Sequence, residues 1–133
     1  MIDIEVMGME DVLKKLKILP ERIQKNVVAG AIRAGASLVA KEMKANAPKD
    51  SGGLRKSIGV VKRKTNNKNI ILFTVAPRVK KNHGFLAHFF EYGTSKMAAQ
   101  PFMRPAFEAK GKEAIDATKK YMIKRIDKEV AKL

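Results

Sequence analysis

Cysteine and tryptophan are absent from the sequence, and aromatic residues make up only 6% of its 133 residues. Without cysteine, the chain can form neither disulfide bonds nor metal sites with thiolate ligands. With so few aromatic side chains, its core must consist mainly of Ile, Leu, Val, Met and Ala. Acidic residues are scarce as well, because 13 Asp and Glu face 28 Lys and Arg, which gives a net charge of +15.

Long apolar runs are also lacking. The two longest apolar patches, residues 27–32 and 70–76, are much shorter than the ~20 residues that cross a bilayer. The first five residues lack the basic start and the apolar run of a signal peptide. We therefore expect a protein that is made in the cytoplasm and has no membrane partner. A hydrophobic content of 45% is typical of a globular chain, and the length predicts a single domain over residues 1–133.

Motifs for catalysis and cofactor binding are missing too. There is no phosphate-binding loop ending in Lys and Ser or Thr, there is no dinucleotide fingerprint, and the carboxylates are too scattered to nominate an acid–base pair. The histidines are His83 and His88. His88 and Glu91 could share a helical face, but neither Asp50 nor Glu108 stands at a spacing that would complete a metal site. We expect no enzymatic activity, no cofactor and no metal.

Hydrophobic periodicity predicts an α+β fold. Apolar residues at steps of three and four predict a long helix over residues 21–47 and a second over residues 102–133. Alternation and β-branched content predict a strand at residues 2–6 and a hairpin with strands at 57–64 and 69–76. We expect a small, mainly antiparallel sheet packed against the first long helix, with the C-terminal helix (about 103–133) beside it or projecting. The pattern also predicts a helix over residues 9–19 and leaves residues 85–92 as helix or strand.

Small residues form the middle of the first long helix. Ala and Gly occupy positions 29–31 and 34–36, although glycine costs a helix about 1 kcal/mol relative to alanine. Small side chains allow another element to approach the helix axis closely. The pattern therefore predicts tight packing of this helix on the sheet or on a neighbouring subunit.

A distinctive turn follows the first long helix. Pro48 ends the helix, because the residue before a proline disfavours the helical region. Asp50 or Ser51 can then cap a short helical turn, and the glycines after it permit a sharp reversal into the hairpin. The residues that define this turn are Pro48, Ser51, Gly52, Leu54 and Arg55.

Two further segments combine Gly or Pro with bulky side chains. In the first, Glu91 could accept hydrogen bonds from backbone amides or a basic side chain, and Gly93 would let the chain turn beside an aromatic residue. In the second, Pro105 can occupy the first turn of the terminal helix, and Phe102 and Phe107 would anchor that turn to the core. The segments are either fold-defining turns or subunit contacts. The candidate contact residues are Glu91, Tyr92, Gly93, Thr94, Pro101, Phe102, Arg104 and Pro105.

Taken in order, these three segments resemble the tail-component family typified by the tenth gene product of phage Hong Kong 97. The family pattern runs Ala-Pro-x-x-[Ser/Thr]-Gly-x-Leu-Arg-x-Ser-Ile, then Glu-[Phe/Tyr]-Gly-Thr, then Pro-Phe-x-Arg-Pro-Ala. The resemblance extends from residue 9 to about residue 107, and the basic stretch at 78–83 departs from it. The matching residues are Ala47, Pro48, Ser51, Gly52, Leu54, Arg55, Ser57 and Ile58, then Glu91, Tyr92, Gly93 and Thr94, then Pro101, Phe102, Arg104, Pro105 and Ala106.

This resemblance implies a structural phage or prophage morphogenesis protein without catalytic activity. Such a protein acts at the virion neck, in head–tail joining or tail completion, as an oligomeric ring between the head connector and the tail tube. The expected partners are further copies of the chain and other phage neck or tail proteins. The protein would be made in the cytoplasm of the host bacterium.

The positive charge supports an alternative, a basic nucleic-acid-binding module associated with phage DNA. Most basic residues are scattered, as on an ordinary solvated surface, whereas a DNA footprint concentrates on one face. Phosphate contacts would make the binding steeply dependent on salt. The candidate patch for DNA or an acidic partner lies around the predicted hairpin: Lys62, Arg63, Lys64, Lys68, Arg78, Lys80 and Lys81.

Overall fold

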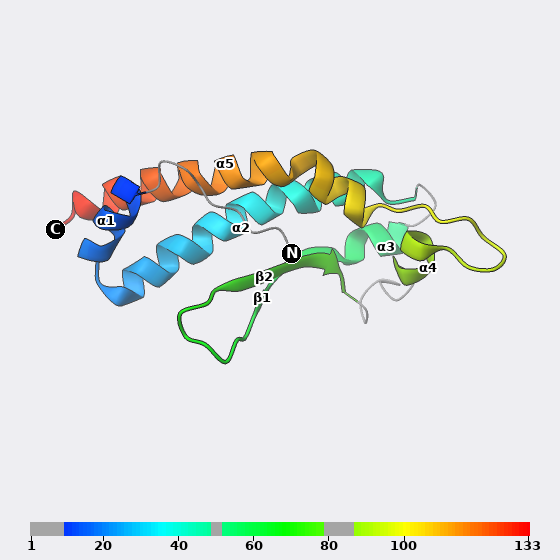
Figure 1. Ribbon diagram of the computed structural model, residues 1–133, viewed down its shortest axis with the longest axis horizontal. Coiled ribbons are helices and arrows are strands. Elements are labelled where there is room, and N and C mark those ends of the chain that lie inside the picture. The colour runs from blue at the N-terminus through cyan, green and yellow to red at the C-terminus, as the bar shows by residue number, and fades with distance from the viewer. Residues whose placement is uncertain (1–9, 49–51, 79–86) are drawn as a thin grey trace.

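The computed structural model describes residues 10–48, 52–78 and 87–133, and two long antiparallel helices dominate it. Helix α2 (Glu21–Asn46) and helix α5 (Met103–Val130) lie side by side over most of their length (Figure 1). Helix α1 (Glu10–Ile18) covers one end of this pair, and the short helices α3 (Gly52–Ser57) and α4 (Ala87–Tyr92) lie at the other. A hairpin of β1 (Ile58–Arg63) and β2 (Leu72–Pro77) packs against α2.

This architecture confirms the predicted α+β fold, a small antiparallel sheet on one long helix with a second long helix after it. The segment for which the sequence left helix and strand open forms helix α4. The strand predicted at residues 2–6 lies outside the described residues. In the part of the chain that the structure describes, no helix is long and apolar enough to cross a membrane.

Prolines stand just outside both ends of α2. Pro20 precedes the first turn, and its carbonyl accepts a hydrogen bond from the backbone N–H of Gln24 at 2.9 Å. The side-chain Nε2 of Gln24 donates to the carbonyl of Leu19 at 2.6 Å, which ties the α1–α2 turn to the helix. Pro48 follows the last turn, as predicted. The buried positions of α2 recur mostly at steps of three and four: Val27, Ala31, Gly35, Val39, Ala40 and Met43.

The Gly/Ala stretch of α2, residues 29–31 and 34–36, receives α5, whereas the sequence predicted that it packs on the sheet or on a neighbouring subunit. A Cβ atom at Gly35 would meet the hydroxyl of Thr118 and lie 2.5 Å from the backbone oxygen of Ala114. A Cβ atom at Gly30 would lie 2.8 Å from Cζ of Tyr121. All three neighbours belong to α5, so the small residues let the two long helices approach closely, and the sheet lies against a different face of α2 (Figure 1).

Two apolar clusters lie at opposite ends of the α2–α5 pair. The first joins α1, the first half of α2 and the last turns of α5, and we call it the α1-end core: Leu16, Leu19, Val27, Ala31, Met122 and Ile126. The second joins the last half of α2 with α3, β1, α4 and the start of α5. We call it the α4-end core: Val39, Ala40, Met43, Ala47, Leu54, Ile58, Ala87, Phe102 and Ala106.

The hairpin pairs residues 58–63 with residues 72–77 in antiparallel register. Its second strand begins later than the predicted residue 69, because the turn is longer than its Asn-rich centre. Thr65 Oγ1 donates to the carbonyl of Asn67 at 2.7 Å, and the N–H of Asn69 donates to Asn67 Oδ1 at 2.9 Å. These local hydrogen bonds keep the backbone of the turn out of the ladder between the strands.

Candidate subunit-contact site

Glu91, in the last turn of α4, caps the N-terminus of α5. Its Oε2 accepts hydrogen bonds from the backbone N–H of Phe102 at 2.8 Å and of Met103 at 3.1 Å, and its Oε1 accepts one from Arg104 at 3.1 Å. The first amides of a helix lack partners within the helix, and they favour a negative charge. The N-cap residue Phe102 makes no side-chain cap bond, so Glu91 supplies the cap from α4. The prediction that Glu91 accepts bonds from backbone amides is confirmed.

The same contacts keep Glu91 ionised. Partial burial acts to raise the pKa of its carboxyl group, but the three backbone amides and the nearby Arg104 guanidinium outweigh that effect. The pKa of Glu91 therefore lies below its ordinary value of 4.5. Hydrogen bonds that favour the charged form of a carboxyl group have this effect generally.

The chain between α4 and α5 is a tight turn with its own hydrogen bonds. Gly93 has a φ of 75°, and a Cβ atom there would lie 2.8 Å from the backbone nitrogen of Ala99. Only glycine fits this conformation and this space. Thr94 and Met97 exchange backbone hydrogen bonds of 2.8 and 3.3 Å. The turn predicted at Gly93 is confirmed, and we call residues 91–105, from the cap to the first turn of α5, the α4–α5 junction.

Exposed side chains occupy defined places on this junction. Tyr92 is 68% exposed, and its ring centroid lies 5.1 Å from that of His88. Phe102 is fully buried, so it anchors the junction to the α4-end core, as predicted. Pro105 stands in the first turn of α5, also as predicted. A hollow of about 490 Å³ lies over the junction and is lined by Glu91, Tyr92, Pro101, Met103, Arg104, Pro105 and Glu108.

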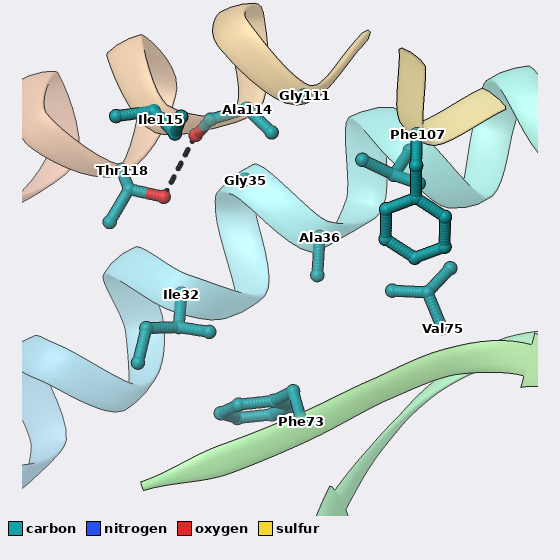
Figure 2. A pocket seen from close by; sticks show the side chains of 11 residues that line it. Ile32, Gly35, Ala36, Phe73, Val75, Phe107, Gly111, Ala114, Ile115 and Thr118 are labelled. Atoms are coloured by element: carbon teal, nitrogen blue, oxygen red, sulfur yellow. Dashed lines mark hydrogen bonds between the residues drawn. The ribbon is translucent and has the colours of Figure 1, made fainter. Parts of the chain in front are cut away.

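An open apolar groove lies between α2, α5 and β2 (Figure 2). Phe107 stands at one side of it and is 40% exposed, so the prediction that Phe107 anchors the terminal helix in the core is wrong. The reason is helical geometry, because Ala106 occupies the core-facing position and the next residue points about 100° away from it. The groove has a volume of about 610 Å³ and is lined by Ile32, Gly35, Ala36, Val39, Phe73, Val75, Phe107, Gly111, Ala114, Ile115 and Thr118.

The turn after α2 is held by two of its predicted residues. Leu54 is buried in the α4-end core. Nη2 of Arg55 donates to the carbonyl of Ala47, the C-cap residue of α2, at 3.4 Å. Gly52 is the first residue of α3, so the predicted short helical turn is confirmed. Ser51 and Asp50, the candidate caps of that turn, lie outside the described residues.

The structure divides the basic residues that the sequence grouped together. Arg78 lies at the end of the strands where the chain enters the hairpin, and its guanidinium lies over Gly59. Lys80 and Lys81 lie outside the described residues. Lys25 of α2, which the sequence analysis did not nominate, lines the same hollow as the basic residues at the turn end of the hairpin. We call this group of five basic residues the hairpin tip: Lys25, Lys62, Arg63, Lys64 and Lys68.

His88 and Glu91 do not converge on a common ligand. The rings of His88 and Phe89 are in edge contact with centroids 6.0 Å apart, whereas the Glu91 carboxylate faces the amides of α5. Within residues 10–48, 52–78 and 87–133, no three His, Cys, Asp or Glu side chains stand close enough together to hold a metal ion. His83 and Asp50 are outside these ranges.

Sequence reasoning missed the groove, and it predicted amide partners for Glu91 without identifying the helix whose N-terminus Glu91 caps. The groove is assembled from three segments, and the cap joins residues 11 to 13 positions apart. The sequence contained one signal for the cap. Glu91 lies 11 residues before Phe102, the N-cap of a helix, and Phe102 has no polar side chain to cap it.

A family model described as "Bacteriophage HK97-gp10, putative tail-component" matches residues 10–93, more than half of the 133 residues. No curated protein and no solved structure matches the chain. The matched region contains α1, α2, the hairpin and α4, and it ends inside the α4–α5 junction. Residues 101–106, the third distinctive segment, lie beyond the match, but Glu91 bonds them directly to the matched region.

Proposed function

This chain belongs to the HK97-gp10-like family of phage tail components, and from that premise we propose that it acts at the neck of the virion. In this proposal it is a structural morphogenesis protein for head–tail joining or tail completion, it has no catalytic activity, and it works as an oligomeric ring. Its partners are further copies of itself and other neck or tail proteins.

The observation that best supports this proposal is that hydrogen bonds from Glu91 hold the α4–α5 junction in one conformation. A surface binds a partner more tightly when its side chains already hold their bound positions, because less conformational entropy is lost. Glu91 fixes the side chains of the junction by joining α4 to three consecutive backbone amides at the N-terminus of α5. Tyr92 and Arg104 are exposed beside it, and Tyr and Arg are enriched among residues that dominate interface energies.

A closed ring needs two different surfaces on each copy, because neighbouring subunits meet head to tail. The junction offers one surface. We propose that the apolar groove is the second, and that it receives α4 of the neighbouring copy. Helix α4 carries Phe89 and Tyr92, which are 44% and 68% exposed, and burying aromatic side chains of this kind in an apolar groove is favourable.

Deletion of the gene from its phage tests the role of the whole protein. We expect electron micrographs of the lysate to show unjoined heads and tails, and the infectious titre to collapse. A plasmid-borne copy of the wild-type gene should restore both. Normal, infectious, tailed virions from the deletion phage would refute the proposal. Gold labelling of a tagged copy should mark the neck, and label along the tail alone would refute the neck assignment.

The substitution Gly111→Glu tests the groove. Gly111 lines the groove, and a Cβ atom there meets nothing within 4 Å, so the new carboxylate has room. We expect this variant to leave the deletion phage uninfectious. Ala109→Glu, at an exposed position of α5 outside the groove, is the matched control and should restore infectivity.

Two results would remove the groove from the proposal. The first is full infectivity with Gly111→Glu. The second is a loss of folding stability with Gly111→Glu that far exceeds that of Ala109→Glu in urea unfolding, since it would mean that the groove is filled by its own chain.

A further inference from the structure

We propose that the hairpin tip is a contact site for the phosphate backbone of double-stranded DNA, a binding activity separate from the proposed assembly role. The site is formed by the end of β1, the turn that follows it and one lysine of α2. It excludes Arg78, which lies at the opposite end of the strands.

Within the described residues, most of the positive charge at the hairpin tip has no acidic partner. Among the described residues, five basic side chains and no carboxylate line a hollow of about 500 Å³ there. Lys25 is paired with Glu21 at 3.2 Å. Over the described ranges 10–48, 52–78 and 87–133, no carboxylate lies within ion-pair distance of the other four. A concentrated positive charge of this kind attracts a polyanion. Binding to DNA is favoured because the counterions condensed on the DNA are released.

The shape of the hairpin suits a duplex. In the part of the chain that the structure describes, the sheet consists of two strands. The turn extends beyond these strands on the side of the fold away from α5 (Figure 1), and Lys25 of α2 lines the same hollow as the turn. The major groove of B-DNA is wide enough to admit a two-stranded β-ribbon. A ribbon with cations at its tip could therefore place them against the phosphates that flank the groove.

The kinds of side chain at the tip favour nucleic acid over an acidic protein. Four of the five cations are lysines, and lysine is depleted in protein–protein interfaces but common among phosphate contacts. Asn67 lines the same hollow, and its side-chain Nδ2 can donate hydrogen bonds to phosphate oxygens. No aromatic side chain of the described residues lines it, which disfavours the base stacking that single-strand binding uses. The expected binding is independent of sequence.

The test measures the affinity of the full chain for a fluorescent 30-base-pair duplex of mixed sequence between ~50 and ~200 mM NaCl. The test variant carries Lys62→Gln, Lys64→Gln and Lys68→Gln together. These three side chains are exposed, so urea unfolding should not change. Each lost phosphate contact lowers the slope of log affinity against log salt by about 0.9, so the slope should fall by up to about 2.7. At ~100 mM salt the affinity should drop on the order of 100-fold.

The matched control carries Lys112→Gln, Lys120→Gln and Lys128→Gln on α5, which are also exposed and remove the same net charge. We expect only a few-fold loss of affinity in this control, because screening weakens distant charges. Equal losses in both variants, or no binding by the wild type at ~50 mM salt, would overturn the proposal. It would also be overturned if polyglutamate at equal charge concentration displaced the duplex completely, since the site would then prefer an acidic protein. None of these results depends on whether the protein forms a ring.

Discussion

The two ends of the α2–α5 pair are built in different ways. At one end, α1 closes the pair through the aliphatic side chains of the α1-end core, and the connection to α2 is a short turn. At the other end, the α4-end core brings together α2, α3, β1, α4 and the start of α5. Only this second end combines apolar packing with a charged group that bonds backbone amides, through Glu91.

The two ends therefore make different contributions: the α1 end mainly stabilises the helix pair, and the α4 end also fixes the geometry of an exposed surface. Aliphatic packing at the α1 end stabilises the helices, but an apolar contact has no direction and tolerates small shifts. Hydrogen bonds at the α4 end have defined lengths and angles, so they fix how the exposed α4–α5 junction is presented. The described residues of all three segments that carry the family resemblance lie at the α4 end, where a partner would need a defined surface.

The largest effect is expected from Phe102→Ala. Phe102 is fully buried in the α4-end core, and such a truncation costs about 3–5 kcal/mol of unfolding free energy. Ile126→Ala in the α1-end core, where Ile126 is 1% exposed, should cost about 2–5 kcal/mol. Urea unfolding measures both. Hydrogen exchange distinguishes them, because only Phe102→Ala should speed exchange at the amides of residues 102–104.

Equal loss of protection at those amides in both variants would mean that the two ends unfold as one unit. The α1 end and the α4 end would then differ in their side-chain chemistry and not in their local stability.

Gly35→Ala should disrupt the close contact between α2 and α5 midway between the two ends. The new methyl group would lie 2.5 Å from the backbone oxygen of Ala114, and backbone cannot move aside as a side chain can. We expect a cost of about 2–3 kcal/mol in urea unfolding. Gly30→Ala is the comparison, because it meets the flexible ring of Tyr121, and it should cost about 1 kcal/mol. A neutral Gly35→Ala would show that α2 and α5 can separate without penalty.

The elements of this fold could be predicted from the sequence, together with the sheet on α2 and the amide contacts of Glu91, whereas the neighbour of the Gly/Ala stretch and the groove could not. The spacing of apolar residues in α2 locates the helix and its buried face, and Pro48 and Gly93 mark turns through their restricted or permissive backbones. The glycines at positions 30 and 35 indicate that another element can approach closely there, but they do not identify that element. The error at Phe107 has the same origin, since an apolar residue one position from the core face of a helix lies beside a groove that only the tertiary structure creates.

Glu91→Gln should remove the charge from the junction while keeping its size. An amide is a weaker acceptor for helix N-terminal amides, so we expect a loss of about 1–2 kcal/mol at neutral pH. Because the pKa of Glu91 is lower in the folded chain than in the unfolded chain, its contribution is fully present above pH 4.5 and is lost as the pH falls through the folded-state value. The difference in unfolding free energy between wild type and variant should therefore shrink in that acidic window.

Urea titrations of both proteins at several pH values measure this effect. Glu113→Gln, on the exposed face of α5 and paired with Lys110 at 3.3 Å, is a control that should change stability by no more than about 0.5 kcal/mol. A constant difference between wild type and Glu91→Gln at all pH values would show that Glu91 acts through packing and not through its charge.

Gly111→Ala should have the smallest effect and the opposite sign. Gly111 stands inside α5, and a Cβ atom there meets nothing within 4 Å, so alanine should raise the unfolding free energy by about 0.5–1 kcal/mol through helix propensity. Its methyl group would enter the groove that separates the two ends. If infectivity in the deletion phage falls while urea unfolding shows higher stability, the loss cannot come from folding and must come from a groove that has to stay open. If both are unchanged or improved, the glycine has no role in assembly, and the contact surface lies at the α4 end alone.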